Sequence, residues 1–444
     1  MAGWVGWGWP IPEGVTTYSA VVTTGIYCRP GCGAKPLAEN VRTFELAAAA
    51  EAAGFRACLR CRPYRVASPV DARAPEMVCR AVQLIIDGVL DEGTEVALGE
   101  RLAVSPRHLR RMFRDHLGVT PDQLARSRRA HFARRLLDDS DLSVADIAFA
   151  SGFGSLRQFN REMRQVFRAA PRELRDRRRR ADRLTADGGL VMRLPYQPPY
   201  DWDAMLEYFA ARAIPGVESV ADSTYRRTIA LDGGPGLLEL TAGTGDHLIL
   251  RAHLPYWEGL IHVVERAARM VGLDTAPAEA LGLDAAPAEG LALDPVLGPR
   301  VRRRPGLRVP GAWGPLEAAV QSVLAQGNSL DDARAEAGEL VARYGHPVPG
   351  LPDGLTHLFP SAEALDTTGL PQAIAQACLA NPAFLDQPLD ALIANLTSIP
   401  GLTADTAHTI ALRLGHQEAF PPSLYDDRAR WHPHQALAAT YLTT

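Results

Sequence analysis

Four cysteines, arranged as two close pairs, constrain the first part of this chain more than any other feature. Cys28 and Cys32 are separated by three residues and Cys58 and Cys61 by two, with 25 residues between the pairs. Thiols at such spacings favour a tetrahedral Zn²⁺ site. Only six cysteines occur in 444 residues, so we expect a reducing, cytoplasmic environment rather than a disulfide scaffold. From spacing alone the site is either a structural zinc knuckle or a reactive centre, because a zinc-bound thiolate is also a nucleophile.

Charge is distributed unevenly along the chain. Residues 1–187 carry 30 Lys and Arg against 22 Asp and Glu, a net charge of +8, whereas residues 188–444 carry 17 against 29, a net charge of −12. A basic half of this kind suggests a nucleic-acid partner. No stretch approaches 18 uncharged apolar residues, so no membrane span is expected.

The order of patterns along the chain predicts a multidomain protein. An Ala-rich helix over 46–54 lies between β-prone segments, helical periodicity dominates 76–176, and β-like alternation surrounds one helix at 202–213 before helices return. The segments 68–75 and 181–189 are predicted linkers. We therefore expect four units: a small zinc α+β domain over 1–67, an all-α domain over 76–180, an α+β unit over 190–300 and an all-α unit over 301–444.

The residues around the cysteines carry a specific resemblance. They read TTGIYCRPGC over 23–32 and AAGFRACLRC over 52–61. This pattern closely resembles the N-terminal domain of the Ada (adaptive-response) DNA methyltransferases. The resemblance implies that the four cysteines hold zinc and that Cys28 takes a methyl group from a DNA methylphosphotriester. It also implies contacts with the DNA backbone from nearby basic residues, namely Lys35, Arg56 and Arg60.

Methylation of such a site changes its charge. Four thiolates on one divalent cation carry a net charge of about −2, and alkylation of one sulfur leaves about −1. Repulsion from DNA phosphates then weakens, so we expect the methylated protein to bind DNA more tightly.

Two helix-turn-helix patterns recur 50 residues apart. In the first, a helix over 96–104 is followed by Ser105 and a proline, a typical helix start; in the second, a helix over 144–150 is followed by one that opens at Ser155. Two hairpins packed only for stability are the alternative, but the basic charge of this half favours DNA binding. The run SGFGSLRQF over 151–159 resembles the AraC-type DNA-binding domain. An all-α double helix-turn-helix domain of this type is expected to contact DNA through Arg107, Arg110, Arg111, Ser155, Arg157 and Gln158.

Two segments of the C-terminal half read RPGLRVPGAW over 304–313 and IPGLT over 399–403. With these segments the C-terminal half looks like a 3-methyladenine DNA glycosylase of the AlkA type, and the second segment stands at the place of that family's helix-hairpin-helix. The resemblance covers residues 190–444, with gaps. It implies an α+β unit followed by an all-α helix-hairpin-helix unit, a fold that flips a damaged base out of DNA and cleaves its glycosidic bond.

The residues that this resemblance assigns to base excision are replaced. Leu424 stands where the catalytic aspartate is expected, and Asp426 and Asp427 lie two and three residues further on. Further departures occur at Thr403, Asp405, Thr409 and His434. No lysine follows Lys35, which excludes a lyase that uses a lysine Schiff base in this half. We therefore expect a degenerate glycosylase-like domain; the alternative is that Asp426 or Asp427 supplies the carboxylate.

Together these features predict a regulator of the response to DNA alkylation damage. It accepts a methyl group on Cys28, then binds promoters in double-stranded DNA and activates repair genes together with RNA polymerase. Two alternatives stay open: a zinc-containing transcription factor without methyl transfer, and a bifunctional regulator that also excises alkylated bases. The complete four-cysteine set favours methyl transfer, and Leu424 disfavours excision. No PCHR segment occurs, so O6-methylguanine repair is not expected.

Overall fold

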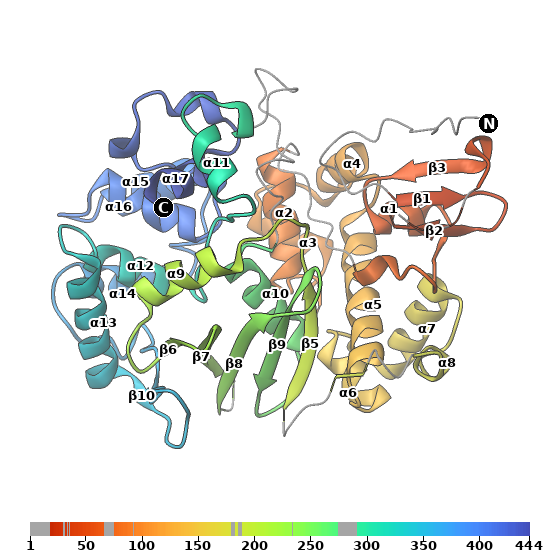
Figure 1. Cartoon of the computed structure of the whole chain (residues 1–444), viewed down its shortest axis with the longest axis horizontal. Helices are drawn as coiled ribbons and strands as arrows, with labels where there is room; N and C mark the ends of the chain where they lie inside the picture. The colour runs from red at the N-terminus through yellow and green to blue at the C-terminus, as the bar shows by residue number, and fades with distance from the viewer. Residues whose placement is uncertain are drawn as a thin grey trace, which may run out of the picture.

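The computed structural model describes residues 18–29, 32, 34, 36–65, 75–91, 93–178, 183–184, 189–232, 234–273 and 291–444. The N-terminal cysteine domain and the C-terminal helices form the two ends of the molecule, and a five-stranded sheet and a group of helices lie between them (Figure 1). Within the described ranges, no helix is long and apolar enough to cross a membrane.

The cysteine domain is built on a four-stranded sheet in the order β3-β1-β2-β4. Its elements are β1 (Tyr18–Val21), β2 (Ile26–Cys28), η1 (Ala38–Asn40), β3 (Val41–Phe44), α1 (Ala47–Ala52), β4 (Arg56–Ala57) and η2 (Pro63–Arg65). Strand β1 pairs antiparallel with β2 and β3, whereas β2 and β4 run parallel, with Tyr27 beside Ala57. Gly25 adopts a φ of +64° in the turn between β1 and β2, a conformation that favours glycine. The parallel pair brings the ends of β2 and β4 to one edge of the sheet.

Two helix-turn-helix units joined by a long helix make up the helical domain. Its elements are α2 (Glu76–Ile86), α3 (Glu95–Arg101), α4 (Pro106–Leu117), α5 (Pro121–Asp139), α6 (Val144–Ala150), α7 (Leu156–Phe167) and α8 (Pro171–Asp176). The Oγ of Ser105 accepts a hydrogen bond from the backbone N–H of His108 at 3.2 Å, and Ser155 does the same for Gln158 at 3.2 Å. The predicted starts of both second helices are thereby confirmed, and α5 connects the two units.

The third unit is an antiparallel sheet in the order β5-β9-β8-β7-β6. Its elements are β5 (Leu190–Pro195), α9 (Trp202–Arg212), β6 (Glu218–Ala221), β7 (Thr224–Leu231), β8 (Gly234–Ala242), β9 (His247–His253) and α10 (Leu260–Met270). Buried and half-buried residues alternate along β9, as expected for a strand with one covered face. Leu250 of β9 packs in one apolar cluster with Met205 of α9 and Val264 of α10. The predicted single helix among strands is confirmed as α9.

The C-terminal part is mainly helical. Its elements are η5 (Leu291–Leu293), α11 (Gly298–Arg303), α12 (Pro315–Leu324), α13 (Leu330–Tyr344), β10 (His346–Pro347), β11 (His357–Leu358), α14 (Leu370–Ala380), α15 (Leu389–Thr397), α16 (Ala404–Arg413), η6 (Pro422–Leu424), η7 (Arg428–Trp431) and α17 (Gln435–Thr443). The predicted helix-hairpin-helix is formed by α15 and α16, with Gly401 at a φ of +88° in the hairpin. The small β10–β11 hairpin was not predicted, because two-residue strands leave no periodic pattern.

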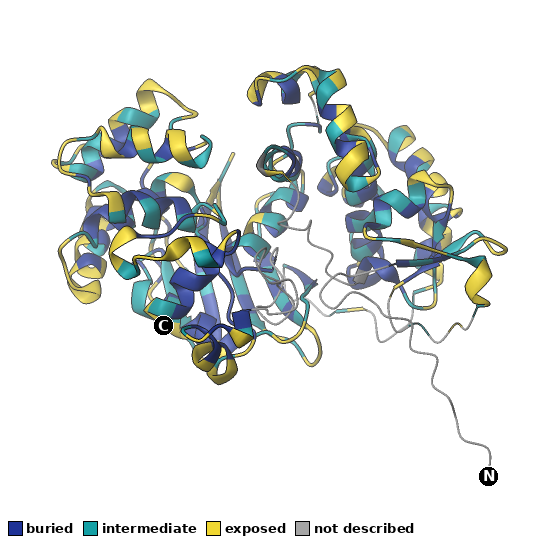
Figure 2. Ribbon diagram, turned by 90° about the horizontal axis from the view of Figure 1, so that it is seen from above, coloured by how far each residue is buried: buried dark blue, intermediate teal, exposed yellow. Residues whose placement is uncertain are grey.

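A single apolar core joins the first three parts of the molecule. It continues from Tyr27 in the cysteine domain through Phe159 in α7 to Leu240 in β8. In Figure 2 buried segments run through both the helical and the sheet-containing parts, with exposed residues on the outside. The cysteine domain, the second helix-turn-helix unit and the sheet therefore pack directly against one another.

Candidate functional site

The four predicted cysteines converge at one edge of the small sheet. Cys28 ends β2 and Cys58 follows β4, so the parallel pairing of these strands brings the two pairs together. All four Sγ atoms lie within 4.8 Å of one another. Zn–S bonds of about 2.3 Å place the sulfurs of a tetrahedron about 3.8 Å apart, so this donor set fits one Zn²⁺. Cys28 is 6% exposed, and the other three cysteines are half-buried.

The four thiols are too close to ionise independently. The hydrogen bond with Cys61, together with burial, raises the pKa of Cys28, and the same hydrogen bond lowers the pKa of Cys61 to about 5. One sulfur thus gains a negative charge while its neighbour keeps a proton. A divalent cation among the sulfurs removes this competition, because it stabilises every thiolate at once.

A buried polar contact beside Cys28 connects the cysteine domain to the helical domain. The Tyr27 hydroxyl donates to Oε1 of Glu51 at 2.7 Å and lies 3.2 Å from Nε2 of His131, which is on α5. The same His131 nitrogen lies 2.5 Å from the Glu51 carboxylate. Burial, with the nearby Glu51 charge, raises the pKa of Tyr27. The residue next to the candidate nucleophile therefore touches the helix that joins the two helix-turn-helix units.

A second buried contact fixes the end of the cysteine domain on the same helix. Asp138 of α5 is fully buried and accepts hydrogen bonds from the Tyr64 hydroxyl at 2.9 Å and from Arg62 at 3.4 Å. Arg134, one turn earlier on α5, also pairs with Asp138. One carboxylate thus holds two groups of the cysteine domain and one of the helical domain.

Both recognition helices, α4 and α7, carry arginine at the surface. The predicted DNA-contacting residues that are exposed are Arg107, Arg110, Arg111, Ser155 and Arg157. Within α4, Arg110 forms an ion pair with Glu95 of α3, and a guanidinium nitrogen of Arg111 lies 3.0 Å from Nδ1 of His108. Gln158 is half-buried. These helices present a basic face to solvent, as DNA binding requires.

The three residues of the cysteine domain that are predicted to contact the DNA backbone have different surroundings. Arg60 is exposed beside Cys61. Arg56 is half-buried and donates to the carbonyl of Ala57 at 3.3 Å. Lys35 lies outside the described residues.

The glycosylase-like half places its candidate residues apart from one another. Leu424 is half-buried and packs against the apolar cluster that contains Phe420 and Trp431. Asp426 and Asp427 are exposed in the segment between η6 and η7. These carboxylates face solvent, whereas a carboxylate that stabilises a glycosyl cation must lie in the base pocket.

The other departures from the glycosylase pattern have structural roles. Thr403 caps α16, since its Oγ1 accepts from the backbone N–H of Thr406 at 3.2 Å. Asp405 accepts from the backbone N–H of Ser423 at 2.9 Å and so fixes the segment before Leu424. The Thr409 hydroxyl donates to the carbonyl of Asp405 at 2.9 Å. His434 is buried. The first three side chains thus form hydrogen bonds with the protein's own backbone, and the fourth is packed inside the protein.

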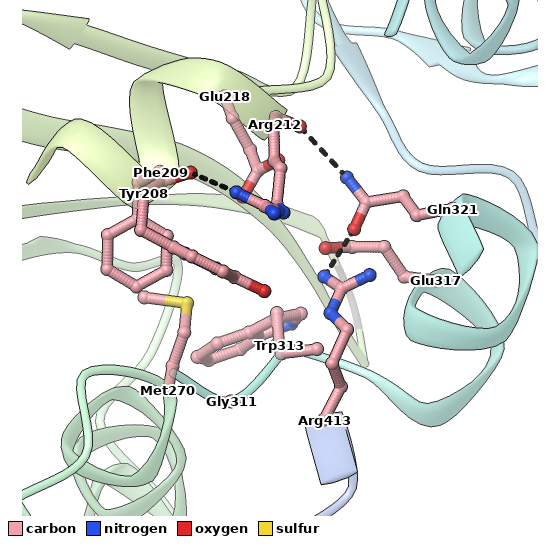
Figure 3. Close-up of a pocket in the computed structure, with 11 residues that line it drawn as sticks. Tyr208, Phe209, Arg212, Glu218, Met270, Gly311, Trp313, Glu317, Gln321 and Arg413 are labelled. Carbon is pink, nitrogen blue, oxygen red and sulfur yellow. Dashed lines mark hydrogen bonds between the residues drawn. The ribbon is translucent and has the colours of Figure 1, made fainter. Parts of the chain in front are cut away.

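A small cavity in this half lies around Trp313, with Glu317 and Glu218 in its lining (Figure 3). Its volume is about 10 Å³, which is space for about one water molecule. Arg227 pairs with Glu317 at 2.8 Å and with Glu218 at 3.4 Å, and its guanidinium lies 5.2 Å from the Trp313 ring centroid. Both carboxylates therefore pair with one buried arginine, and the cavity is too small for a purine base.

Several residues that build these contacts were not predicted. Glu51, His131 and Asp138 lie on helices whose polar positions resemble ordinary solvent-facing ones in sequence, so their burial left no signal. Arg62, by contrast, directly follows Cys61 in sequence. Its position next to a cysteine was the signal that would have singled it out.

Three family models match successive parts of the chain. They are the metal binding domain of Ada over residues 15–64, a helix-turn-helix domain over 98–177 and the AlkA N-terminal domain over 191–314. The resemblances seen in the sequence, the zinc cofactor and the multidomain fold class are confirmed: a small α+β zinc domain, a helical DNA-binding region and a glycosylase-like α+β/α domain.

Relatives with curated names match either nearly the whole chain or one part of it. The chain is 36% identical, over 96% of its length and 92% of the relative, to the "Probable bifunctional transcriptional activator/DNA repair enzyme AlkA" of Mycobacterium tuberculosis. It is 29% identical to "DNA-3-methyladenine glycosylase 2" of Escherichia coli over 50% of this chain and 79% of that protein. It is 33% identical to "Bifunctional transcriptional activator/DNA repair enzyme Ada" of Escherichia coli over 35% of this chain and 43% of that protein.

Proposed function

Because the chain belongs to the family of the bifunctional transcriptional activator/DNA repair enzymes of the AlkA type, we propose that it repairs DNA methylphosphotriesters on Cys28 and responds by activating repair genes. The chain is an Ada-type regulator of the alkylation response, with a four-cysteine zinc site and a helix-turn-helix region. The observation that carries the proposal is the convergence of four Sγ atoms within 4.8 Å. We place the domains at 1–67, 76–180, 190–300 and 301–444.

In this proposal the zinc would be held by Cys28, Cys32, Cys58 and Cys61. When bound, it would keep their sulfurs deprotonated. The Cys28 thiolate attacks the methyl carbon of the neutral phosphotriester. The S–C bond forms as the O–C bond breaks, and the electron pair of the O–C bond stays on the phosphate oxygen, which restores the phosphodiester anion. The resulting thioether has no ready route back to the thiolate, so each molecule acts once.

The transfer also alters DNA binding. One negative charge disappears from the cysteine cluster, so repulsion from DNA phosphates weakens and affinity rises. The contact of Tyr27 with Glu51 and His131 lies next to the modified sulfur and reaches α5. Recognition helices α4 and α7 then enter successive major grooves about 34 Å apart. Promoter DNA and RNA polymerase are the proposed partners, in the cytoplasm.

The proposed DNA contacts fall into two groups. Sequence readout is assigned to the basic faces of the recognition helices, from Arg107, Arg110, Arg111, Ser155, Arg157 and Gln158. Backbone contacts near the cysteine cluster are assigned to Lys35, Arg56 and Arg60. Exposure supports all of these except Arg56 and Gln158, which are half-buried, and Lys35, which lies outside the described residues.

Mass spectrometry after incubation with methylphosphotriester DNA tests the transfer. The intact protein should gain about 14 Da once, and the modified peptide should contain Cys28. The Cys28→Ala variant should gain nothing, and Cys378→Ala, which alters a half-buried cysteine of α14, should behave as the wild type. Since only 6% of Cys28 is exposed, peptide mapping is essential: modification of Cys32, Cys58 or Cys61 instead, or repeated turnover, would refute this assignment.

We further propose that the glycosylase-like half does not excise 3-methyladenine. Leu424 occupies the position of the expected catalytic aspartate and is unable to stabilise a cationic sugar. The exposure of Asp426 and Asp427 and the small cavity at Trp313 support this conclusion.

The likeness to DNA-3-methyladenine glycosylase 2 favours the opposite function, a working glycosylase. Incubation of the full chain with alkylated DNA decides between them. Released base above background that disappears in Asp426→Asn or Asp427→Asn would establish the bifunctional alternative.

A further inference from the structure

An open cleft of about 370 Å³ lies where the cysteine domain, α5 and the five-stranded sheet meet. Cys61 of the cysteine cluster forms part of its wall. Five arginines from the three parts line it: Arg29, Arg60, Arg62, Arg135 and Arg193. Its volume lies in the range of sites that bind small ligands, so the cleft has room for a phosphate and part of its sugar.

Contacts between the parts fix the walls of the cleft. Arg135 of α5 donates to the carbonyl of Arg193 in β5 at 2.5 Å. Arg193 in turn pairs with Asp139 of α5 at 2.8 Å, and its backbone N–H donates to the same carboxylate at 3.2 Å. These contacts hold strand β5 of the glycosylase-like half against the helical domain, so the fold itself fixes the walls of the cleft.

Arginines outnumber carboxylates in the lining of the cleft. Two aspartates, Asp139 and Asp246, face the five arginines; Asp139 pairs with Arg193, and Arg62 pairs with the buried Asp138 behind the cleft wall. A concave site with this balance favours an anion. Arginine is also the side chain whose planar fork best matches phosphate oxygens.

The chemistry of the proposed substrate explains why such a site would be needed. A methylphosphotriester is neutral, so positive charge does not attract it. Charged phosphodiesters beside it must hold the strand in place. Cys61 lines the cleft and its Sγ lies within 4.8 Å of the Cys28 Sγ, so a phosphodiester in the cleft lies close to the proposed reacting sulfur.

We propose that this cleft binds a phosphodiester of the alkylated DNA strand, so that the glycosylase-like half is part of the DNA-binding surface of the methyl-acceptor site. Arg193 and His247, which line the cleft from that half, act as positioning residues. This inference rests on the proposed function of Cys28. It gives the glycosylase-like half a role in repair that needs no base excision.

A pair of variants in one strand tests the proposal. His247 and His253 are the first and last residues of β9, about 20 Å apart along an extended strand. His247→Glu adds a negative charge to the cleft, and His253→Glu adds the same charge at the far end. The DNA is a short duplex without promoter sequence that carries one methylphosphotriester. Binding as a function of salt and the rate of mass gain are measured for the full chain.

We expect His247→Glu to lower both DNA affinity and the rate of methyl transfer roughly tenfold, the size expected for loss of one charge-assisted hydrogen bond. The slope of log affinity against log salt should fall by about one. His253→Glu should match the wild type in both measurements. Thermal unfolding of both variants checks that the fold is unchanged.

A scan of the DNA provides a second readout. Single phosphates beside the damage are replaced by neutral methylphosphonates, one position at a time. The wild type should lose affinity most strongly at one position, and His247→Glu should lose little more at that same position, because the contact is already weakened. Arg135→Gln retains a donor for the Arg193 carbonyl. Its DNA affinity should likewise fall little further when the phosphate at that position is replaced.

Equal affinities for the two glutamate variants, or a scan that is identical in wild type and His247→Glu, would overturn the proposal. A wild-type protein that gains no methyl group would instead overturn the proposed function of Cys28. The binding and scanning measurements do not require transfer, so the two failures are distinguishable.

Discussion

The two candidate reaction centres of this chain differ in how their chemistry-bearing residues are placed. In the cysteine domain, strand pairing gathers four sulfurs within 4.8 Å. In the glycosylase-like half the helix-hairpin-helix is intact, yet Leu424 packs into an apolar cluster while Asp426 and Asp427 face solvent. A core needs only apolar side chains of suitable volume, whereas a site needs particular groups at particular distances. Conservation of a fold therefore says little about conservation of its chemistry.

The surroundings of the two centres differ in the same way. Beside Cys28, Tyr27 reaches across to Glu51 and His131 and so touches the helix between the recognition helices. Beside Leu424, Asp405 accepts a hydrogen bond from the backbone N–H of Ser423 and so holds the local backbone. The first centre is connected to the helix between the recognition helices, whereas the contacts named above for the second centre, among the residues that the structure describes, lie within the glycosylase-like half.

The largest effect expected is the loss of one zinc ligand. Cys58→Ala leaves three sulfurs, so zinc content should fall from one per chain to nearly zero and methyl transfer should stop. Structural zinc contributes about 10–16 kcal/mol of apparent binding free energy in small domains, so the cysteine domain should also unfold locally. Elemental analysis and intact mass measure the result, with Cys378→Ala as control. Full zinc occupancy in Cys58→Ala would contradict the assignment of Cys58 as a zinc ligand.

A smaller effect tests whether the cysteine domain depends on its contact with α5. Asp138→Ala removes the buried partner of Arg62, Arg134 and Tyr64, so the free energy of unfolding should fall by about 3–5 kcal/mol. Asp141→Ala is the matched control, because its partners Arg178 and Arg183 form exposed ion pairs that contribute at most about 1 kcal/mol. Equal losses in the two variants, measured by urea unfolding, would contradict this account.

Sequence reasoning succeeded where a local pattern determines the structure. Ser105 and Ser155 mark the starts of their helices because capping involves residues three positions apart. The cysteine spacing likewise predicted the cluster. Asp138 and Arg193 were not predicted, because their partners lie 74 and 54 residues away in sequence. A contact at such separation depends on how finished domains pack, and no local periodicity encodes it.

A carboxylate introduced at position 424 tests whether the glycosylase-like centre lacks only its catalytic group. Leu424→Asp places a charge against the cluster around Trp431, so the free energy of unfolding should fall by about 1–3 kcal/mol. Base excision should still be absent, because the cavity at Trp313 has a volume of about 10 Å³. Leu424→Asn is the uncharged control. If Leu424→Asp released 3-methyladenine and Leu424→Asn did not, the glycosylase-like centre would lack only its carboxylate. It would then differ from the cysteine site by a single side chain.

The two helix caps separate a structural role from a DNA contact. Ser105→Ala and Ser155→Ala should each lower the free energy of unfolding by about 1 kcal/mol, the usual loss for an N-cap. If Ser155 also contacts DNA, its replacement should weaken promoter binding more than that of Ser105 at a temperature where both variants are folded. Equal changes in affinity would restrict Ser155 to capping.

The smallest effect concerns the contact between the glycosylase-like half and the helical domain. In α10, Nε2 of His262 lies 2.7 Å from Asp91 and Nδ1 lies 3.0 Å from the carbonyl of Ile86. Both ring nitrogens face acceptors, which suits the doubly protonated ring. Burial lowers the pKa of His262, but hydrogen bonds to Asp91 and Ile86 and the charges of Asp91 and Glu265 outweigh it and raise the pKa above its ordinary value.

Because the folded-state pKa of His262 is the higher one, protonation stabilises this contact. This contribution is complete below the unfolded pKa of about 6.5 and is lost as pH rises through the folded value. The wild type should therefore have a higher Tm at pH 6, relative to pH 8, than His262→Gln does. Asp91→Asn should remove the same difference, because it takes away the partner that favours the charged ring. A pH dependence unchanged in both variants would show that the helical domain and the glycosylase-like half are held together by their apolar core and by arginine pairs such as Arg193 with Asp139, independently of this histidine.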